Sequence, residues 1–146
     1  MISNSIEINR RPEEVFAYLD DLGRHHEWQE QIVESRVETE GPTRVGTRAV
    51  DKRNVPGGPR DVGYEITEHE PPRLAAFRGT DGPIRPEGRM IVEATGDGAS
   101  SRVTVELEMR GHGFGKLFAP FARRDAARQI TKDQAKLKEV LESGSV

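Results

Sequence analysis

Cysteine is absent from this chain of 146 residues, and so is any long apolar run. Without cysteine there is no disulfide, no thiolate ligand for a metal ion and no cysteine nucleophile. No stretch reaches the roughly 18 consecutive apolar residues of a membrane-spanning helix, and the N-terminal residues lack the apolar core of a secretory signal. We therefore expect a cytoplasmic protein without stable membrane insertion.

Charge is plentiful but mixed in sign. Charged residues make up 32% of the chain and hydrophobic residues 34%, which suits a soluble protein, and the net charge is −3. Acidic and basic residues are interspersed, which argues against nucleic acid as a partner. The length indicates one domain, residues 1–146, large enough to bury a core.

Common catalytic and metal-binding motifs are also missing. No Gly-x-Ser-x-Gly, His-x-x-x-His or Glu-x-x-His spacing occurs, so we expect no metal site and no cofactor. The adjacent His25 and His26 would point about 100° apart on a helix and cannot readily converge on one ion. His69, at a strand end, and His112, in a glycine-rich loop, are expected to be exposed, and a general base at either stays open.

Helical signals lie at the two ends of the chain. Pro12 followed by two glutamates is typical of a helix start, and the apolar stripe that follows comprises Val15, Phe16, Leu19 and Leu22. Gly23 ends that helix. Residues 24–31, which include the only tryptophan, Trp28, predict a second short helix. A longer amphipathic stretch covers residues 118–142.

Between these ends the chain alternates in short runs punctuated by glycine, proline and aspartate. The alternation is clearest in the last run, where every second residue from Val103 to Met109 is apolar. With a first strand over residues 2–8, about seven strands are predicted, joined by hairpins into an antiparallel sheet. The six later runs are residues 32–40, 46–55, 60–69, 73–78, 85–95 and 101–110.

The terminal helical stretch falls into two pieces at Pro120, which we interpret as a kink or as the true start of the long helix. Beyond it, one face carries Ala126, Ile130, Leu137, Val140 and Leu141. The basic residues of this helix predict a solvated face, with attraction to anionic lipid as the weaker alternative.

Before Pro120, the glycines of residues 111–115 predict a mobile hinge between the last strand and the long helix. The apolar residues that accompany this hinge predict either a gate or a hydrophobic patch for a homodimer. They are Phe114, Leu117, Phe118 and Phe121.

Several strings in this order resemble the START-like superfamily, which has the helix-grip fold, and in particular its polyketide cyclase/dehydrase branch. They are SIEINRRPEEVFAYLDDL, HEW, VGTR, YEITEHEPPRLAAFRG and GRMIVEATGDGASSRVTVELEM, which together extend over most of the chain. The resemblance implies an α+β fold in which a curved antiparallel sheet of about seven strands wraps around a long C-terminal helix. Two short helices follow the first strand.

The resemblance further implies an apolar cavity between the concave sheet face and the terminal helix. Strand register places eight residues on that face: Ala49, Tyr64, Ile66, Phe77, Met90, Val92, Val105 and Leu107. Phe118 and Phe121 are expected at the entrance. The alternative is that the eight residues pack against the long helix as an ordinary core.

Three polar residues share this face: Asp51, Arg53 and Tyr64. One interpretation is a carboxylate, a guanidinium and a phenol that together polarise a carbonyl group of a ligand. The other places Asp51 and Arg53 at the solvated rim, near the hairpin of residues 55–60. The second is favoured, because buried charges require partners.

Three hypotheses for function follow. The leading one is binding or transport of a small hydrophobic, aromatic or lipid-like molecule in the cavity. The second is an enzyme of the polyketide cyclase/dehydratase type, suggested by resemblance alone, in which cavity shape orients a reactive chain. The third is a protein-interaction module that uses residues 114–121.

Overall fold

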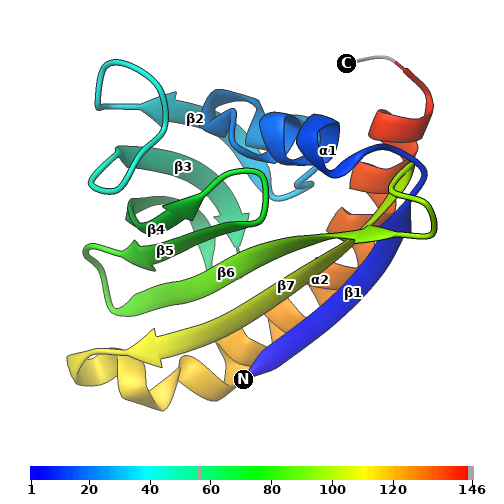
Figure 1. Ribbon diagram of the computed structural model, residues 1–146. Coiled ribbons are helices and arrows are strands. Elements are labelled where there is room, and N and C mark those ends of the chain that lie inside the picture. Colours follow the sequence, from blue (N-terminus) through cyan, green and yellow to red (C-terminus); the bar gives the residue numbers. More distant parts are fainter. Residues whose placement is uncertain (56, 145–146) are drawn as a thin grey trace.

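The computed structural model describes residues 1–55 and 57–144. Seven strands form one antiparallel sheet in the order β1-β7-β6-β5-β4-β3-β2. Figure 1 shows the sheet curling around the long helix α2, with α1 at one end of the molecule and η2 at the other. The elements are β1 (Ile2–Ile8), α1 (Pro12–Leu19), η1 (Leu22–Glu27), β2 (Ile32–Val37), β3 (Arg48–Val55), β4 (Gly58–Glu70), β5 (Leu74–Gly79), β6 (Ile84–Thr95), β7 (Ser100–Gly111), η2 (Gly113–Leu117) and α2 (Ala119–Glu142).

The predicted helix-grip architecture is confirmed. The second short helix is confirmed with different bounds: it is a 3-10 helix that begins at Leu22 and ends at Glu27, not one over residues 24–31, and Trp28 follows it. The first helix ends at Leu19 rather than at Gly23. A 3-10 turn suits such a short connection between α1 and β2, because it needs few residues.

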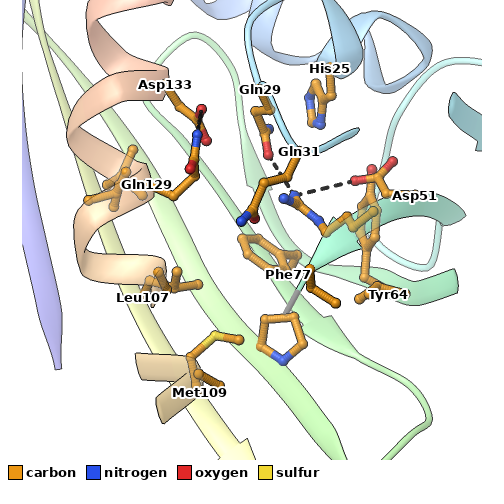
Figure 2. A pocket seen from close by; sticks show the side chains of 18 of the residues that line it. His25, Gln29, Gln31, Asp51, Tyr64, Phe77, Leu107, Met109, Gln129 and Asp133 are labelled. Carbon is orange, nitrogen blue, oxygen red and sulfur yellow. Dashed lines mark hydrogen bonds and ion pairs between the residues drawn. The ribbon is translucent and has the colours of Figure 1, made fainter. Parts of the chain in front are cut away.

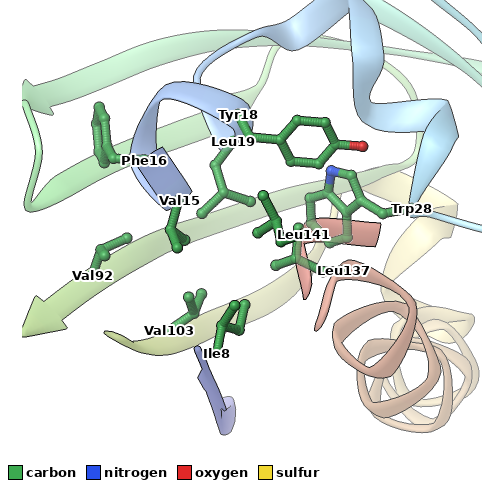
Figure 3. Close-up of a cluster of buried hydrophobic side chains, with 10 residues drawn as sticks. All are labelled: Ile8, Val15, Phe16, Tyr18, Leu19, Trp28, Val92, Val103, Leu137 and Leu141. Atoms are coloured by element: carbon green, nitrogen blue, oxygen red, sulfur yellow. The ribbon is translucent and has the colours of Figure 1, made fainter. Parts of the chain in front are cut away.

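The core gathers at the end of the molecule that α1 covers. Figure 3 shows side chains from α1 meeting Val92, Val103 and the C-terminal half of α2. Val15 and Leu137 are completely buried, and Leu141 is 2% exposed. The apolar stripe predicted for α1 therefore supplies one wall of this core, and the end of α2 supplies another.

A polar contact fixes α2 against β1 beside this core. Gln134 is 1% exposed, and its side-chain nitrogen donates to the backbone carbonyls of Asn4 (3.1 Å) and Val103 (3.3 Å). The side chain of Asn4 donates in turn to the Gln134 side-chain oxygen. Asn4 breaks the apolar alternation of β1 because it partners a buried amide.

The start of α2 confirms one interpretation. The helix begins at Ala119 with Pro120 in its first turn, so the proline marks the true helix start. Of the preceding glycines, Gly111 and Gly115 are closely packed, whereas a Cβ added at Gly113 would meet no atom within 4 Å, and the hinge stays a prediction. A Cβ added at Gly115 would lie 1.8 Å from the carbonyl oxygen of Pro83. Glycine is needed there because two backbones touch.

No helix within the described residues is long and apolar enough to cross a membrane.

Replacing Leu137 with alanine tests whether the core end of α2 stabilises the fold. We expect Leu137→Ala to lower the free energy of unfolding by about 2–5 kcal/mol, because it leaves a cavity in a fully buried site. Leu117→Ala is the matched control, since Leu117 is 70% exposed and surface changes cost about 0.5 kcal/mol or less. Urea denaturation measures both, and equal losses would contradict this assignment of the core.

Candidate functional site

A cavity of about 710 Å³ lies inside the curve of the sheet. Its walls come from the concave face of β3–β7, from the end of α1, from η1 and the loop after it, from η2 and from α2. The volume falls within the roughly 300–1,000 Å³ of typical small-molecule sites. The cavity exists because α1 and the C-terminal half of α2 fill only one end of the concave face.

Ten of the twelve residues predicted for a ligand site line this cavity: Asp51, Arg53, Tyr64, Ile66, Phe77, Met90, Val105, Leu107, Phe118 and Phe121. Their role in binding stays a prediction. Ala49 and Val92 lie outside the lining. Ala49 packs in a cluster with Leu22 and Tyr64, and Val92 packs in the core with Val15. Strand register alone cannot tell which part of one face a helix covers.

Asp51 and Arg53 both line the cavity. The favoured interpretation of a solvated rim was wrong for Asp51, which is buried, whereas the Arg53 side chain keeps 24% of its surface exposed. Asp51 is 3% exposed, and Arg53 Nη2 lies 3.7 Å from Asp51 Oδ2. Arg53 also donates to the side-chain oxygen of Gln29 at 2.6 Å (Figure 2). The guanidinium is thus held between a carboxylate from its own strand and an amide from the loop after η1, which keeps the buried charges compensated.

Three residues that line the cavity each have a buried side-chain atom without a hydrogen-bond partner among the described residues. The atoms are Asp51 Oδ1, the hydroxyl of Tyr64 and the indole Nε1 of Trp28. Burial raises the pKa of the Tyr64 phenol, and the nearby Asp51 carboxylate raises it further. Tyr64 therefore stays protonated at neutral pH. Its ring meets Phe77 edge-on, with centroids 5.8 Å apart.

The inner face of α2 carries polar side chains that sequence reasoning missed. Asp133 is 7% exposed and accepts hydrogen bonds from Gln129 (3.0 Å) and from the backbone N–H of Glu30 (3.2 Å). Burial raises the pKa of the Asp133 carboxyl. Asp125 accepts a hydrogen bond from Gln31 at 3.0 Å. These contacts tie α2 to the loop after η1.

A sequence signal for these residues existed. Asp133 precedes Leu137 by four positions, and Gln134 precedes it by three, so both share the face of a residue that was expected inside. Gln129 precedes Asp133 by four positions, so it lies on that face as well. The apolar residues were assigned to the interior and the polar ones to solvent, although helical spacing made no such distinction.

His25 also lines the cavity, and the sequence analysis did not predict this. It is 5% exposed, and its Nε2 lies 2.8 Å from the carbonyl oxygen of Leu19. A carbonyl only accepts, so Nε2 carries the proton. Burial lowers the pKa of His25, against the opposing effect of the Leu19 hydrogen bond. A neutral His25 therefore leaves Nδ1 as an acceptor.

Of the two histidines that were expected to be exposed, His69 and His112, only one is exposed. His112 is exposed, as expected. His69 is not, because its Nε2 lies 2.8 Å from Asp20 Oδ1 and its side chain is 11% exposed. Within the part of the chain that the structure describes, no three histidine, aspartate or glutamate side chains gather in a way that could hold a metal ion.

The cavity is polar at one end and apolar at the other. In Figure 2 His25, Gln29 and Asp51 lie at the upper end of the view, and Leu107 and Met109 lie at the lower. Beyond that apolar end, η2 and the start of α2 present exposed aromatic rings. Phe114, Phe118 and Phe121 all line the cavity while 86%, 59% and 71% exposed. Their action as a gate or as a partner surface stays a prediction.

A comparison with known protein families shows to which family this chain belongs. Residues 1–142 match the family described as polyketide cyclase/dehydrase and lipid transport. The chain belongs to this family. The resemblance noted from the sequence is thereby confirmed, and the match spans all of the elements that build the cavity.

Solved structures agree on the fold. A START superfamily protein from Mycobacterium smegmatis is similar with a TM-score of 0.80 and 12% identity, covering 97% of both chains. The Zhui aromatase/cyclase from a Streptomyces species gives 0.79 and 13%, over 97% of this chain and 92% of the other. The di-domain ARO/CYC BexL gives 0.75 and 17%, over 96% of this chain and 45% of the other. At such identities the likeness shows the fold alone. No curated protein matches the chain.

The buried His25 predicts a pH dependence of stability. Its pKa is lower in the folded protein than the 6.5 of a free imidazole, so the unfolded chain binds more protons as the pH falls through that value. Stability should therefore be lost on acidification from about pH 7.5 to about pH 5.5. His25→Gln should reduce this loss, because glutamine keeps an N–H donor for Leu19 and does not titrate.

Urea denaturation at the two pH values measures the effect. His112→Gln is the matched control, since His112 is exposed, and it should keep the wild-type loss. If His25→Gln loses as much stability on acidification as the wild type does, the neutral buried imidazole is refuted.

Proposed function

We propose that this protein binds a small hydrophobic or aromatic molecule in its internal cavity, as a carrier, sensor or sequestering protein. The observation that supports this most is the 710 Å³ cavity itself, whose lining is mainly apolar. Burying apolar surface is the main favourable contribution to binding. The family description, which includes lipid transport, is consistent with this proposal.

The arrangement of the walls suits such a ligand. Leu107 and Met109 offer aliphatic surface, and Phe77 and Tyr64 offer aromatic surface. A few polar groups at one end would fix the orientation of the ligand, as in most small-molecule sites. The expected cytoplasmic location, based on the absence of cysteine, stays a prediction.

Filling the cavity tests the proposal. Ala126 lines the cavity from α2, whereas its neighbour Ala127 faces solvent. We expect Ala126→Trp to weaken binding of a neutral apolar dye, N-phenylnaphthylamine, about tenfold or more, because the indole occupies the space that the dye needs. Ala127→Trp should bind the dye as the wild type does. Dye fluorescence measures affinity, and a thermal melt verifies folding.

Two results would contradict the proposal. One is no dye binding by the wild type at any accessible concentration. The other is equal affinity in the two tryptophan variants, which would place the dye outside the cavity.

A second candidate is an enzyme of the cyclase/dehydratase type. It is favoured by one observation: the buried Asp51 and Tyr64 and the half-buried Arg53 lie together in the cavity wall. Arg53 could stabilise negative charge that develops on a carbonyl oxygen of a folded polyketide-like chain, while the cavity orients that chain.

The substitution Arg53→Gln distinguishes between the two candidate functions. An enzyme should lose about 10²-fold or more in the rate at which a linear poly-β-keto thioester cyclises and loses water, while dye binding stays. Mass spectrometry of the products measures the rate. Cyclisation no faster than the uncatalysed reaction in the wild type would exclude this candidate for that substrate.

A further inference from the structure

An exposed apolar patch covers the η2 end of the molecule, opposite the end that α1 covers (Figure 1). It consists of Phe114, Leu117, Phe118 and Phe121, which are 86%, 70%, 59% and 71% exposed. We call these four residues the η2 patch. Apolar residues scattered singly over a surface are normal, but a cluster of large ones marks contact with another protein or with a membrane.

Local structure directs the η2 patch outward. Phe114 and Leu117 are three residues apart in η2, and this spacing puts them on one side of a 3-10 helix. Another part of η2 packs on the loop between β5 and β6, where a Cβ added at Gly115 would lie 1.8 Å from the carbonyl oxygen of Pro83. The start of α2 is ordered by a hydrogen bond of 3.0 Å from the Phe121 backbone N–H to the Phe118 carbonyl.

The charge around the η2 patch is positive, although the chain as a whole is negative. Residues 111–124 contain Lys116, Arg123 and Arg124 and no acidic residue, in a chain with 25 acidic residues and a net charge of −3. Lys116 and Arg124 are exposed and have no ion-pair partner among the described residues. Arg124 follows Phe121 by three positions on α2, so the two side chains are neighbours on the helix surface.

Acidic residues that adjoin this segment are already paired or lie elsewhere. Glu108 is engaged by Arg123 at 2.7 Å, and Asp125 is engaged by Arg128 at 2.6 Å. Asp81, in the loop on which η2 packs, lines a different surface hollow. An anionic partner would therefore meet the two free cations without facing an acidic residue of residues 111–124.

This charge pattern favours a membrane over a second copy of the chain. In a two-fold dimer the same surface meets itself, so Lys116 and Arg124 would approach like charges. A membrane that contains anionic lipids offers an apolar interior to phenylalanine and leucine, and negative head groups to lysine and arginine.

We propose that the η2 patch docks this protein reversibly onto an anionic membrane surface. The four apolar side chains enter the boundary between head groups and acyl chains, and Lys116 and Arg124 contact the head groups. Phe114, Phe118 and Phe121 also line the cavity, so its mouth then faces the membrane. This interaction goes beyond the binding function proposed above, and it can be measured with no ligand in the cavity.

Vesicle co-sedimentation with the full chain tests the docking. Vesicles of phosphatidylcholine alone are compared with vesicles that contain roughly one third phosphatidylglycerol. We expect the wild type to bind the anionic vesicles about tenfold or more tightly, because two free cations face them. Added salt should reduce this preference, since exposed charges are screened.

Two variants assign the docking to this surface without touching the cavity, because neither Leu117 nor Lys116 lines it. Leu117→Ser and Lys116→Glu should each weaken binding to anionic vesicles about tenfold, and both should bind N-phenylnaphthylamine as the wild type does. Val45→Ser and Lys52→Glu are the matched controls and should keep wild-type vesicle binding. Val45 is 61% exposed in the loop between β2 and β3, and Lys52 is exposed on β3.

The outcomes keep the two proposals apart, because dye binding without vesicles tests the binding function alone. The docking is overturned if the wild type does not bind anionic vesicles, or binds both kinds of vesicle equally. It is also overturned if Leu117→Ser or Lys116→Glu keeps wild-type affinity, or if the controls lose as much as these variants do. A wild-type dimer in sedimentation equilibrium that Leu117→Ser converts to a monomer would assign the patch to a second copy instead.

Discussion

A curved sheet of seven strands presents one concave face, and a single long helix is available to cover it. One straight helix cannot fill the concavity of a strongly curved sheet. Part of the concave face therefore stays uncovered unless another element packs there. Here α1 packs at one end, where Val15 and Leu137 are fully buried. The rest of the concave face lies under η1, the loop after it, η2 and the start of α2, which leave the cavity between them and the sheet. The position of α1 therefore decides where the core lies and where the cavity lies (Figure 1).

The polar interior has a structural consequence besides its proposed role in binding. The three consecutive residues after Trp28 each contact a different partner. Gln29 accepts from Arg53 on β3, the backbone N–H of Glu30 donates to Asp133 on α2, and Gln31 donates to Asp125, which lies nearer the start of α2. These hydrogen bonds join α2 to β3, the strand next to the edge strand β2. Apolar packing stabilises one end of α2, and directional polar contacts position the other.

The fold was predictable from local patterns because they have fixed periods. Alternation from Val103 to Met109 identified the inner face of β7, and Pro120 marked the start of α2. The polar part of the site was harder to predict. Asp51 was placed at the solvated rim because buried charges require partners, and Asp133 was not singled out as an interior residue. In both cases the partner that makes burial tolerable, Arg53 in one and the backbone of Glu30 in the other, is recognisable only once strand and loop are in place.

The sequence by itself determined the elements, their order and the side of each strand that faces inward, because these depend on neighbours within a few residues. It also carried enough family likeness to identify the helix-grip fold. The tertiary structure decided that Val92 belongs to the core while Met90 lines the cavity, although both lie on one face of β6. It also decided that the Tyr64 hydroxyl and Asp51 Oδ1 are buried without hydrogen-bond partners among the described residues. The reason is physical: burial and pairing depend on which distant segment covers a residue, and no local pattern encodes that.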